Sequence, residues 1–391
     1  MLLRRIAAII SAKYAEIMRY IYDYKNWPNF VWQEEVLAAT LAEVRHRQGR
    51  LIGRMESLGF ALQNEAALST LTEEVVKSSE IEGEQLDQNQ VRSSIARRLG
   101  LDVAGLVRAE RDVEGVVDMM LDATQNYAQP LTKNRLLAWH AALFPTGRSG
   151  LSLILVGKWR NDASGPMQVV SGPFGRERVH YQAPAAYRLP GEMRAFLSWL
   201  KSEKSIDPVL IAGIAHLWFV TLHPFEDGNG RIARAITDLA LARSENCALR
   251  FYSMSSQICA ERNRYYEILE RTQKGTLDIT EWLHWFLDCL NRAFDRAEQT
   301  TNKVLAKARL WEAIKDQPLN VRQQLILNRL LDHFEGKLTS SKWAKLAKCS
   351  QDTAARDIDD LIGKGILVRG SSGGRSTSYE LAPPWTGTET L

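Results

Sequence analysis

A stretch of twelve residues in the middle of the chain, 223–234, combines side chains that can hold phosphate, bind a metal and accept a proton. It reads His-Pro-Phe-Glu-Asp-Gly-Asn-Gly-Arg-Ile-Ala-Arg. Gly228 and Gly230 allow a tight turn whose successive amide N–H groups form a concave anion site at the start of the following helix. Arg231 and Arg234 share one face of that helix because they lie three residues apart. Two guanidinium groups over such a turn suit a di- or triphosphate.

Two further residues of this stretch carry the metal and proton chemistry. Asp227 lies directly before the glycines, and its carboxylate can hold Mg²⁺, which takes oxygen ligands and often bridges phosphates. His223 lies at the end of the preceding apolar run and has the pKa of a general base near neutrality. The alternative without function is a helix–helix corner with a solvated arginine pair and a core histidine. The fixed spacing of all these residue types favours a nucleotide site instead.

The elements that must position this turn are two buried helices. The apolar run 206–222 leads into the turn and the apolar run 232–242 leads out of it, and runs of this length and composition are typical of core helices. No other nucleotide or metalloprotease motif competes, since the chain has no G-x-x-x-x-G-K-[ST], no kinase glycine loop with a downstream H-R-D, and no H-E-x-x-H.

The same twelve residues resemble the signature of the Fic (Fic/Doc) family of protein adenylyltransferases, H-x-F-x-[D/E]-G-N-[G/K]-R-x-x-R, and match it at every position. The resemblance covers most of the chain, but this signature is its specific part. It implies a helical Fic core with a β-hairpin flap. It also implies an enzyme that transfers AMP from ATP to a Ser, Thr or Tyr hydroxyl of a target protein or of itself, with Mg²⁺ as cofactor.

The resemblance assigns a role to each residue of the stretch. His223 would be the catalytic base that takes the proton of the attacking hydroxyl, and Asp227 would hold Mg²⁺ on the phosphates. The other motif residues would contact ATP through its phosphates: Gly228, Asn229 and Gly230 at the transferring phosphorus, Arg231 on the β side and Arg234 on the γ-phosphate. Because such a transfer depends mainly on positioning and electrostatics, this set suffices without a covalent enzyme intermediate.

A hairpin is predicted upstream, where β-forming residues flank a Gly-rich loop between Gly165 and Tyr181. From the residues alone it is a plain surface hairpin. The resemblance implies that it is the flap, on which a target protein docks at residues 165–181 by pairing an extended segment with a strand edge. The ATP-binding residues of the flap would be Val169, Val170, Ser171 and Gly172.

Three residues downstream would contact the adenine. Tyr265 and Tyr266 lie on a predicted helix where family members often carry a Tyr-Tyr pair, and Gln273 lies further along the same helix. Ordinary core packing is the alternative for each tyrosine.

An inhibitory pattern precedes the motif. Ser78, Glu82 and Gly83 match the family pattern [S/T]-x-x-x-E-[G/N], although a solvated helix face explains most such glutamates. The resemblance implies that Glu82 pairs with Arg234 and occupies the position that the γ-phosphate needs. The same carboxylate could instead orient a water that removes AMP from a modified protein, so the reverse reaction stays open as an alternative.

Composition sets the broad class. The chain has 391 residues, 45% of them hydrophobic and 25% charged, which is typical of a soluble protein of two or three domains. Its net charge of +4 neither requires nor excludes nucleic acid. The cysteines show no C-x-x-C spacing, which argues against a zinc site or a disulfide framework and favours the reducing cytoplasm. They are Cys247, Cys259, Cys289 and Cys349.

The N-terminus does not predict export. The apolar run 6–10 after Arg4 and Arg5 is short and soon followed by charged residues, so it is not a signal peptide, and no apolar run is long enough to span a membrane. We therefore expect a cytoplasmic protein with no membrane contact. Translation is expected to start at Met18, because recognisable sequence begins at Tyr20.

The predicted fold is mainly α, in four parts. Residues 1–105 form a helical segment with the inhibitory motif, similar to a segment of unknown function often found ahead of a Fic core. Residues 106–300 form the Fic catalytic core, with helices expected at 279–297 and, as a connector within 301–319, at 305–318. Residues 320–391 carry three short helices and a hairpin, which resemble a winged helix-turn-helix domain.

The C-terminal domain leaves its partner open. Its predicted recognition helix holds Arg356 among four acidic residues that repel phosphate, namely Asp352, Asp357, Asp359 and Asp360. Arg369 and Arg375 on the wing are the positive charges that could still attract phosphate. Protein contact or homodimerisation is at least as well supported as DNA binding, and a DNA-binding regulator that only senses a nucleotide is the alternative from another functional class. The sequence does not name the target protein, the modified hydroxyl, the preferred nucleotide or the oligomeric state.

Overall fold

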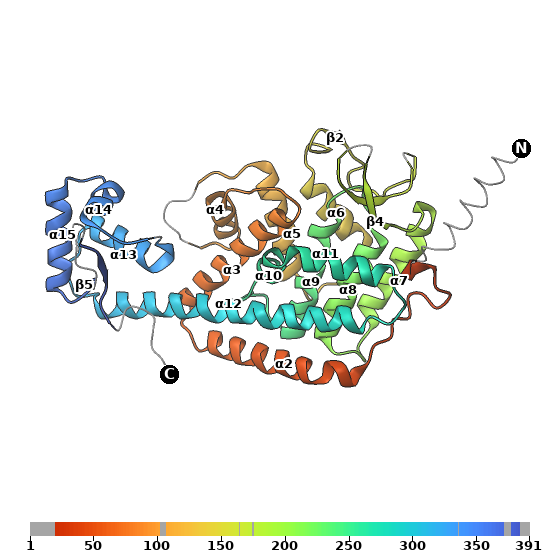
Figure 1. The fold of residues 1–391 in the computed structure, drawn as a ribbon, viewed down its shortest axis with the longest axis horizontal. Helices are drawn as coiled ribbons and strands as arrows, with labels where there is room; N and C mark the ends of the chain where they lie inside the picture. The colour runs from red at the N-terminus through yellow and green to blue at the C-terminus, as the bar shows by residue number, and fades with distance from the viewer. Residues whose placement is uncertain are drawn as a thin grey trace, which may run out of the picture. The chain divides into compact units, whose positions relative to one another are not determined.

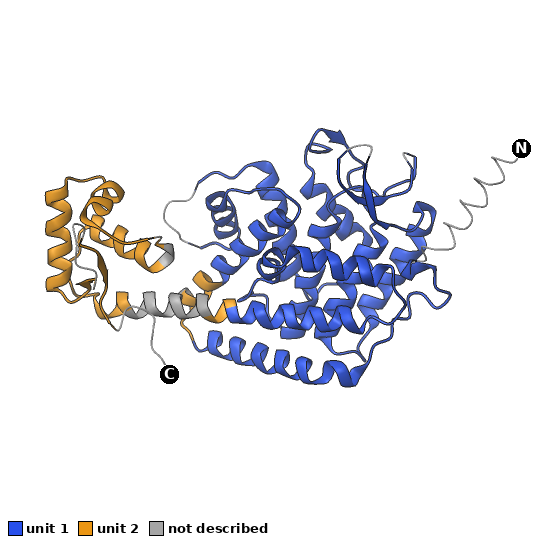
Figure 2. Cartoon of the chain, in the orientation of Figure 1, with its two compact units in different colours: residues 1–57, 67–295 blue, residues 58–66, 296–391 orange. Residues whose placement is uncertain are grey.

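The structure is a computed structural model that describes residues 20–101, 107–163, 165–173, 176–334, 336–370 and 377–383. The chain divides into two compact units, coloured separately in Figure 2. The first contains residues 1–57 and 67–295, and the second contains residues 58–66 and 296–391. The first unit therefore includes both the predicted inhibitory segment and the predicted catalytic core. Met18, the expected start of translation, and Arg375 of the predicted wing lie outside the described residues.

Most of the described chain is helical (Figure 1), as predicted. Up to residue 295 the elements are η1 (Ile21–Asp23), α2 (Glu34–Glu56), α3 (Phe60–Ile81), α4 (Gln88–Arg98), α5 (Arg111–Gln125), α6 (Lys133–Leu143), β1 (Arg148–Ser149), β2 (Ser152–Leu153), β3 (Gln168–Ser171), β4 (Arg178–Gln182), η2 (Ala186–Arg188), α7 (Leu189–Ser202), α8 (Pro208–Leu222), α9 (Asn229–Glu245), α10 (Met254–Ala260), α11 (Arg262–Gln273) and the first part of α12 (Thr280–Ala313).

The core of the first unit is built around α8. Its residues are apolar on all sides and almost all buried, as expected for a helix surrounded by others. Asp207 caps its start by accepting from the Val209 N–H at 2.8 Å, with Pro208 in the first turn. The helix packs against α9 and is bound to α12 by the Trp282 indole N–H, which donates to the Gly213 carbonyl at 2.9 Å. The two predicted helices on either side of the motif are therefore confirmed.

Helix α12 differs from the prediction. Two separate helices were expected at 279–297 and 305–318, but α12 is continuous over 34 residues. The intervening stretch 298–304 is polar and contains neither glycine nor proline, so nothing in it ends a helix. In Figure 1, α2 runs beside the first part of α12, and Arg47 donates to the Asn291 carbonyl at 2.9 Å.

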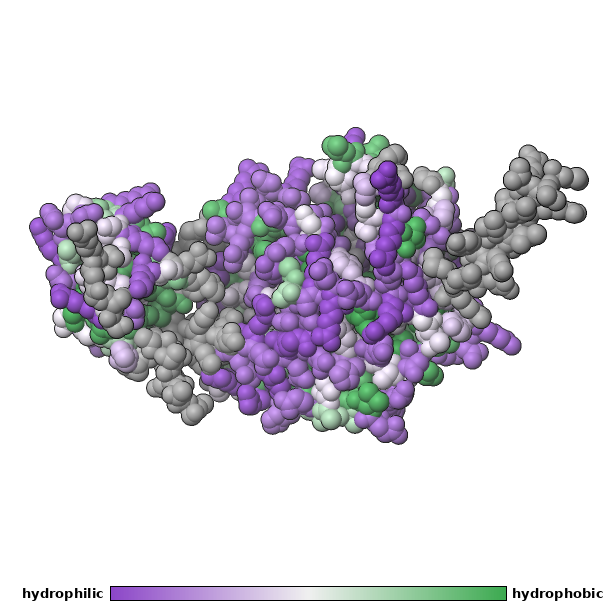
Figure 3. Space-filling model, viewed as in Figure 1, coloured by the Kyte–Doolittle hydropathy of each residue, from purple (hydrophilic) through white to green (hydrophobic). Residues whose placement is uncertain are grey.

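Two small antiparallel hairpins belong to the first unit. Strands β1 and β2 pair Ser149 with Ser152, and Leu151 at the tip is 95% exposed. Figure 3 shows the hydrophobic colour at this tip. Strands β3 and β4 pair Val169 with Tyr181, with an irregularity after Val169. The predicted hairpin between residues 165 and 181 is therefore present.

The second unit ends in the predicted order of three helices and a hairpin. Its elements are α13 (Val321–His333), α14 (Ser340–Ala347), α15 (Gln351–Gly363), β5 (Leu367–Arg369) and β6 (Tyr379–Leu381). Its core includes Trp343, Leu327 and Ile358, all fully buried. This core gives the unit its own hydrophobic interior, as expected of a separate domain.

Two acidic residues of α15 are engaged within the second unit. Asp357 is buried and accepts from the Arg322 guanidinium at 2.8 Å, and Asp360 accepts from the Lys364 ammonium at 2.5 Å. Asp357 thereby ties α15 to α13, whereas the side chain of Asp360 is 47% exposed and pairs within its own helix end. The electrostatic argument against DNA therefore loses the buried Asp357 only, and DNA binding stays a prediction.

In the part of the chain that the structure describes, no helix is long and apolar enough to cross a lipid bilayer. The four cysteines are free thiols.

A buried ionic cluster stabilises the first unit. Arg250 is 1% exposed, pairs with Asp238 and Glu245, and lies over the Tyr252 ring at 4.3 Å. Because removing one partner leaves buried charge uncompensated, we expect the exchange Arg250→Met to lower the free energy of unfolding by about 3–5 kcal/mol in urea denaturation. The control Arg271→Met breaks an exposed pair and should cost less than about 1 kcal/mol. Equal losses of unfolding free energy in the two variants would contradict a stabilising role of the buried cluster.

Two core histidines make stability depend on pH. Burial lowers the pKa of His140 to about 4 and that of His216 to about 3. The unfolded chain, with histidine pKa values of about 6.5, then binds more protons in the window between. The free energy of unfolding should therefore fall by about 1.4 kcal/mol per histidine for each pH unit below 6.5. Urea denaturation at several pH values from 7 to 5 measures this, and His140→Gln should remove about 1.4 kcal/mol per pH unit from the slope. A free energy of unfolding that does not change over this pH range would contradict the burial of these histidines in neutral form.

Candidate active site

A cavity of about 530 Å³ lies where the motif turn, the β3–β4 hairpin, α11 and the end of α3 meet. It brings together most of the residues that the sequence singled out. The predicted site residues that line it are Glu82, Val169, Val170, Ser171, His223, Asp227, Asn229, Gly230, Tyr265, Tyr266 and Gln273. These residues come from four separate parts of the sequence, so the cavity exists only in the folded chain.

His223 ends α8 in the left-handed conformation, with φ of 47°. This places its partly exposed ring on the cavity wall rather than in the core. Its Nδ1 lies 3.2 Å from the Val220 carbonyl oxygen, which can only accept a hydrogen bond. The proton of a neutral ring is therefore on Nδ1, and Nε2 keeps its lone pair. The histidine is held in the tautomer that accepts a proton.

The surroundings of His223 favour this neutral form. Burial lowers the pKa of His223 to about 4, although the hydrogen bond to the Val220 carbonyl works in the opposite direction. Arg160 adds to the lowering and holds the backbone, because its Nε donates to the His223 carbonyl at 2.7 Å. This carbonyl closes the helix, so its partner is long-range. No sequence signal marks Arg160 for this role.

The turn after His223 is braced by its own polar side chains. Asn229 accepts from the Phe225 N–H at 3.0 Å and donates to the Phe225 carbonyl at 2.8 Å. Its side-chain amide is thus used to hold the turn rather than free to face a phosphorus, as the resemblance had implied. Asp227 accepts from the Ser149 hydroxyl of β1 and from the Gly228 N–H. Ser149 is a second residue that the sequence did not indicate.

Arg234 is buried and held from three sides. Its Nε donates to the Ser78 hydroxyl at 2.8 Å, and its Nη2 donates to the Ser78 carbonyl at 2.7 Å and to the Glu82 carboxylate at 2.8 Å. The expected pair between Glu82 and Arg234 is therefore present. Among the described residues, the buried Nη1 has no hydrogen-bond partner. One donor of this guanidinium is thus left over beside the cavity.

Gly83 makes this contact possible. Helix α3 ends at Ile81, and Gly83 follows with φ of 86°, a conformation that costs glycine little. The chain thereby turns so that Glu82 reaches Arg234.

Arg231 takes a different course from its neighbour. It is 2% exposed, lies over the Phe144 ring at 5.1 Å and pairs with Glu84. It lines a second cavity of about 540 Å³, whereas the resemblance had implied contact with the β side of ATP beside His223. Glu84 was not identified from the sequence, because a glutamate on a turn carries no signal of its long-range partner.

The flap is attached to α11 by a chain of hydrogen bonds. The Ser171 hydroxyl lies 2.5 Å from His180 Nε2, and His180 Nδ1 lies 2.7 Å from the Glu270 carboxylate. Although burial opposes it, hydrogen bonds from Lys274 and His180 lower the pKa of Glu270 to about 2. The carboxylate is therefore charged at neutral pH and fixes the hairpin over the cavity. Gly172 lies at the end of β3 with φ of 103°.

The three residues predicted beside the adenine differ in exposure. Tyr265 is 2% exposed, and its hydroxyl lies 2.8 Å from Nε2 of His216. Tyr266 is 38% exposed, and its hydroxyl donates to the Ile81 carbonyl at 3.4 Å. Gln273 is buried and lies 3.4 Å from the Thr221 hydroxyl. Tyr265 thus belongs both to the core and to the cavity wall.

Comparison with known proteins identifies two domains in the chain. The sequence profile of the Fic/DOC family matches residues 130–241, which include the whole motif, and the profile of a domain of unknown function, DUF4172, matches residues 20–101. The chain carries a Fic/DOC domain. The Fic domain thus includes α6, the flap and the α8–α9 pair, while Glu82 and Glu84 belong to the preceding domain of unknown function.

Curated relatives match parts of the chain. A protein adenylyltransferase Fic of Drosophila yakuba is 32% identical over 132 residues, which are 32% of this chain and 25% of that protein. A probable protein adenylyltransferase of Aquifex aeolicus is 30% identical over 103 residues, 26% of this chain and 30% of that protein. The chain thus spans between a quarter and a third of the length of these relatives.

A solved structure supports the Fic fold over a larger part of the chain. The crystal structure of a Fic family protein from Desulfovibrio desulfuricans G20 matches with a TM-score of 0.50 and 22% identity, covering 88% of this chain and 96% of that one. At this identity the likeness concerns the fold alone.

Two carboxylates of the motif, Glu226 and Asp227, line the cavity, and Glu226 is already engaged by the Leu155 N–H at 2.8 Å. Asp227 lines the cavity, and Mg²⁺ usually takes only one or two protein carboxylates together with substrate phosphates and waters. Within the described ranges, no group of three or more His, Cys, Asp or Glu side chains is arranged to hold a metal by itself. The residues present therefore fit an ion that arrives with the nucleotide phosphates.

Proposed function

We propose that the protein is a protein adenylyltransferase that transfers AMP from ATP to a Ser, Thr or Tyr hydroxyl of a target protein and of itself. The single observation that carries this proposal is that His223, with a free Nε2, shares one cavity with Asp227 and the start of α9. The adenylyltransferase names of the relatives support the same activity.

In the proposed reaction, the target hydroxyl gives its proton to Nε2 of His223 and its oxygen attacks the α-phosphorus in line. A new oxygen–phosphorus bond forms, the bond to the β-phosphate oxygen breaks, and pyrophosphate leaves. The backbone amides that follow Gly228 point out of the N-terminus of α9 and stabilise the charge on the phosphates. Arg234 is the donor for the γ-phosphate, once Glu82 has left it.

Mg²⁺ would be held by Asp227 and by the phosphates, and it would neutralise part of their charge. The base of the nucleotide would lie against Tyr266 and Gln273, which line the far part of the same cavity. The flap would receive the target, because β3 and β4 form a two-stranded sheet that leaves strand edges for an extended segment.

We further propose that Glu82 inhibits the transfer. Its carboxylate takes the Arg234 donor that the γ-phosphate needs, so ATP binds without the contact that orients it. Because the same carboxylate lines the cavity with His223, removal of AMP from a modified protein is the second candidate activity.

The experiment that tests the proposal is incubation of the full chain with each α-labelled nucleoside triphosphate and Mg²⁺, followed by mass analysis of the labelled protein. Wild type and Glu82→Gly are compared side by side. With ATP we expect a mass increase of one AMP, and we expect a larger fraction of the variant than of the wild type to carry it. Release of AMP from pre-modified protein by wild type only would favour the second activity. No covalent label with any nucleotide, together with no release of AMP from pre-modified protein, would contradict both activities.

A further inference from the structure

The turn that follows α3 carries two carboxylates, and each one holds a different arginine of the motif. Glu82 pairs with Arg234, and Glu84, two residues later, pairs with Arg231. The two contacts differ in their access, because Glu82 lines the cavity with His223 whereas Glu84 lines the second cavity. The second contact therefore has a surface opening of its own.

The second cavity is built around a buried guanidinium. Arg231 is 2% exposed, and in the described part of the chain its buried Nε has no hydrogen-bond partner. A buried donor without a partner is costly, and a ligand with several acceptor oxygens can satisfy it. The Phe144 ring, 5.1 Å from the guanidinium carbon, holds it in place.

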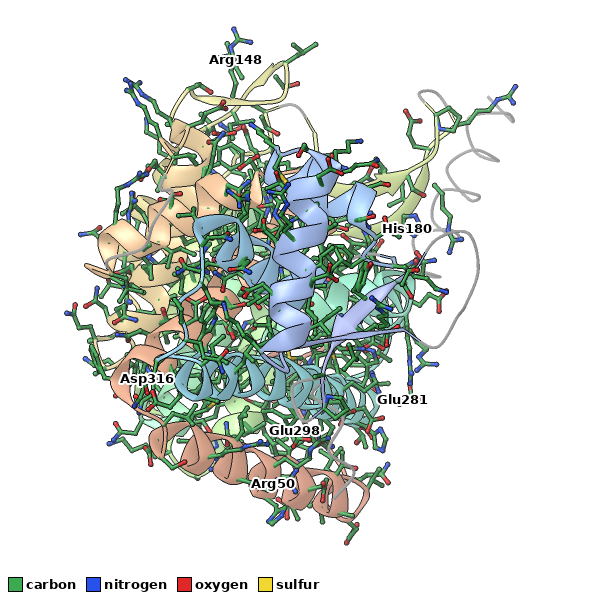
Figure 4. All side chains as sticks on the ribbon, turned by 90° about the vertical axis from the view of Figure 1, so that its left-hand side faces the viewer. Arg50, Arg148, His180, Glu281, Glu298 and Asp316 are labelled. Atoms are coloured by element: carbon green, nitrogen blue, oxygen red, sulfur yellow. The ribbon has the colours of Figure 1, made fainter. Side chains whose placement is uncertain are left out.

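The charges of this cavity balance only while Glu84 is present. Arg111, Arg148 and Arg231 face the three carboxylates Glu84, Glu110 and Asp112. Arg148 lies at the rim, where Figure 4 shows its side chain pointing away from the protein. If Glu84 loses its charge, or if the Glu84 side chain turns out of the cavity, the cavity has one positive charge in excess.

Glu84 is also the less firmly held of the two carboxylates. Its side chain is 45% exposed, against 30% for Glu82. Burial raises the pKa of Glu84, and the neighbouring carboxylates Asp227 and Glu82 add to this effect, although Arg231 opposes it. The half-exposed Glu84 carboxylate, beside two like charges, is therefore easier to displace from its arginine than Glu82.

We infer that the second cavity is an anion site for a phosphate-class ligand, with Arg231 as the main contact and Glu84 as its internal occupant. The ligand fits where the Glu84 carboxylate now lies, and a polyphosphate oxygen reaches the free Nε of Arg231. The source of the ligand rests on the proposed function, in which pyrophosphate is the leaving group. The site itself does not depend on any transfer.

Binding of inorganic pyrophosphate to the full chain, measured by isothermal titration calorimetry at low salt without nucleotide, tests the inference. We expect Glu84→Gln to bind pyrophosphate about tenfold more tightly than wild type, since about 1.4 kcal/mol corresponds to tenfold. Glu110→Gln removes the same charge from the same cavity without touching Arg231, and should change the affinity less than threefold. Orthophosphate as a second probe distinguishes the leaving group from a free phosphate ion.

Two further results would overturn the inference. One is an equal gain in Glu84→Gln and Glu110→Gln, which indicates general charge rather than a site. The other is tight binding that persists in the double variant Arg231→Lys/Glu84→Gln, which keeps the charge but not the guanidinium. The calorimetry does not depend on transfer. If the labelling experiment finds no transfer but Glu84→Gln still binds pyrophosphate more tightly, the proposed function is wrong and the anion site is retained.

Discussion

Replacing His223 with alanine should lower AMP transfer about a hundredfold or more, because it removes the imidazole that is proposed to take the hydroxyl proton. The ring is fixed in the accepting tautomer by the Val220 carbonyl and kept neutral by burial, so it acts without prior deprotonation at neutral pH. Initial rates with α-labelled ATP and the Glu82→Gly background give the ratio. Nucleotide binding, measured separately, should change little.

The backbone at His223 calls for a matched variant. Its φ of 47° is tolerated by asparagine better than by alanine, so His223→Asn removes the base while keeping the turn. Both variants should lose activity to a similar extent. If His223→Asn keeps more than a third of the wild-type rate, the base is another group, and the mechanism proposed above is wrong.

Replacing Glu82 with glycine should raise self-modification and target modification about tenfold or more. The carboxylate leaves Arg234, whose guanidinium is then free for the γ-phosphate while Ser78 still orients it. Quantitative mass analysis of labelled protein at equal ATP concentration measures the change.

Two controls separate charge from backbone effects. Glu82→Gln keeps the size and the helix end but loses the charge, and should give an intermediate rate. Glu80→Gln removes a carboxylate that pairs with Lys77 on the same helix end, and should leave the rate unchanged. An activation by Glu80→Gln equal to that by Glu82→Gly would mean that loosening of α3, and not release of Arg234, is responsible.

Sequence patterns predicted the site where the information is local. The apolar runs on both sides of the motif mark α8 and α9, and Gly83 marks the end of α3, because a residue with positive φ ends a helix. The pair between Glu82 and Arg234 could be predicted only from the resemblance to a family motif. Spacing by itself does not connect two residues 152 positions apart.

The sequence could not predict which of several possible partners, distant in the chain, each polar side chain of the site contacts. Arg231 and Arg234 share a helix face, yet one turns to Glu84 and the other to Glu82, a difference set by the tertiary position of the turn after α3. Asn229 was expected to face phosphate, but its amide satisfies the Phe225 backbone within a buried turn. Local residue types cannot rank such competing partners.

Gly230 bears on the proposed inhibition by Glu82. A Cβ atom at this position would lie 2.1 Å from the Glu82 carboxylate oxygen, far inside contact distance. The missing methyl group is therefore the space in which the carboxylate lies. Glycine weakens a helix by about 1 kcal/mol relative to alanine, and α9 accepts this loss within its first turn. An alanine at this position would push the Glu82 carboxylate away from Arg234, so the proposed inhibition depends on the absence of a side chain at position 230.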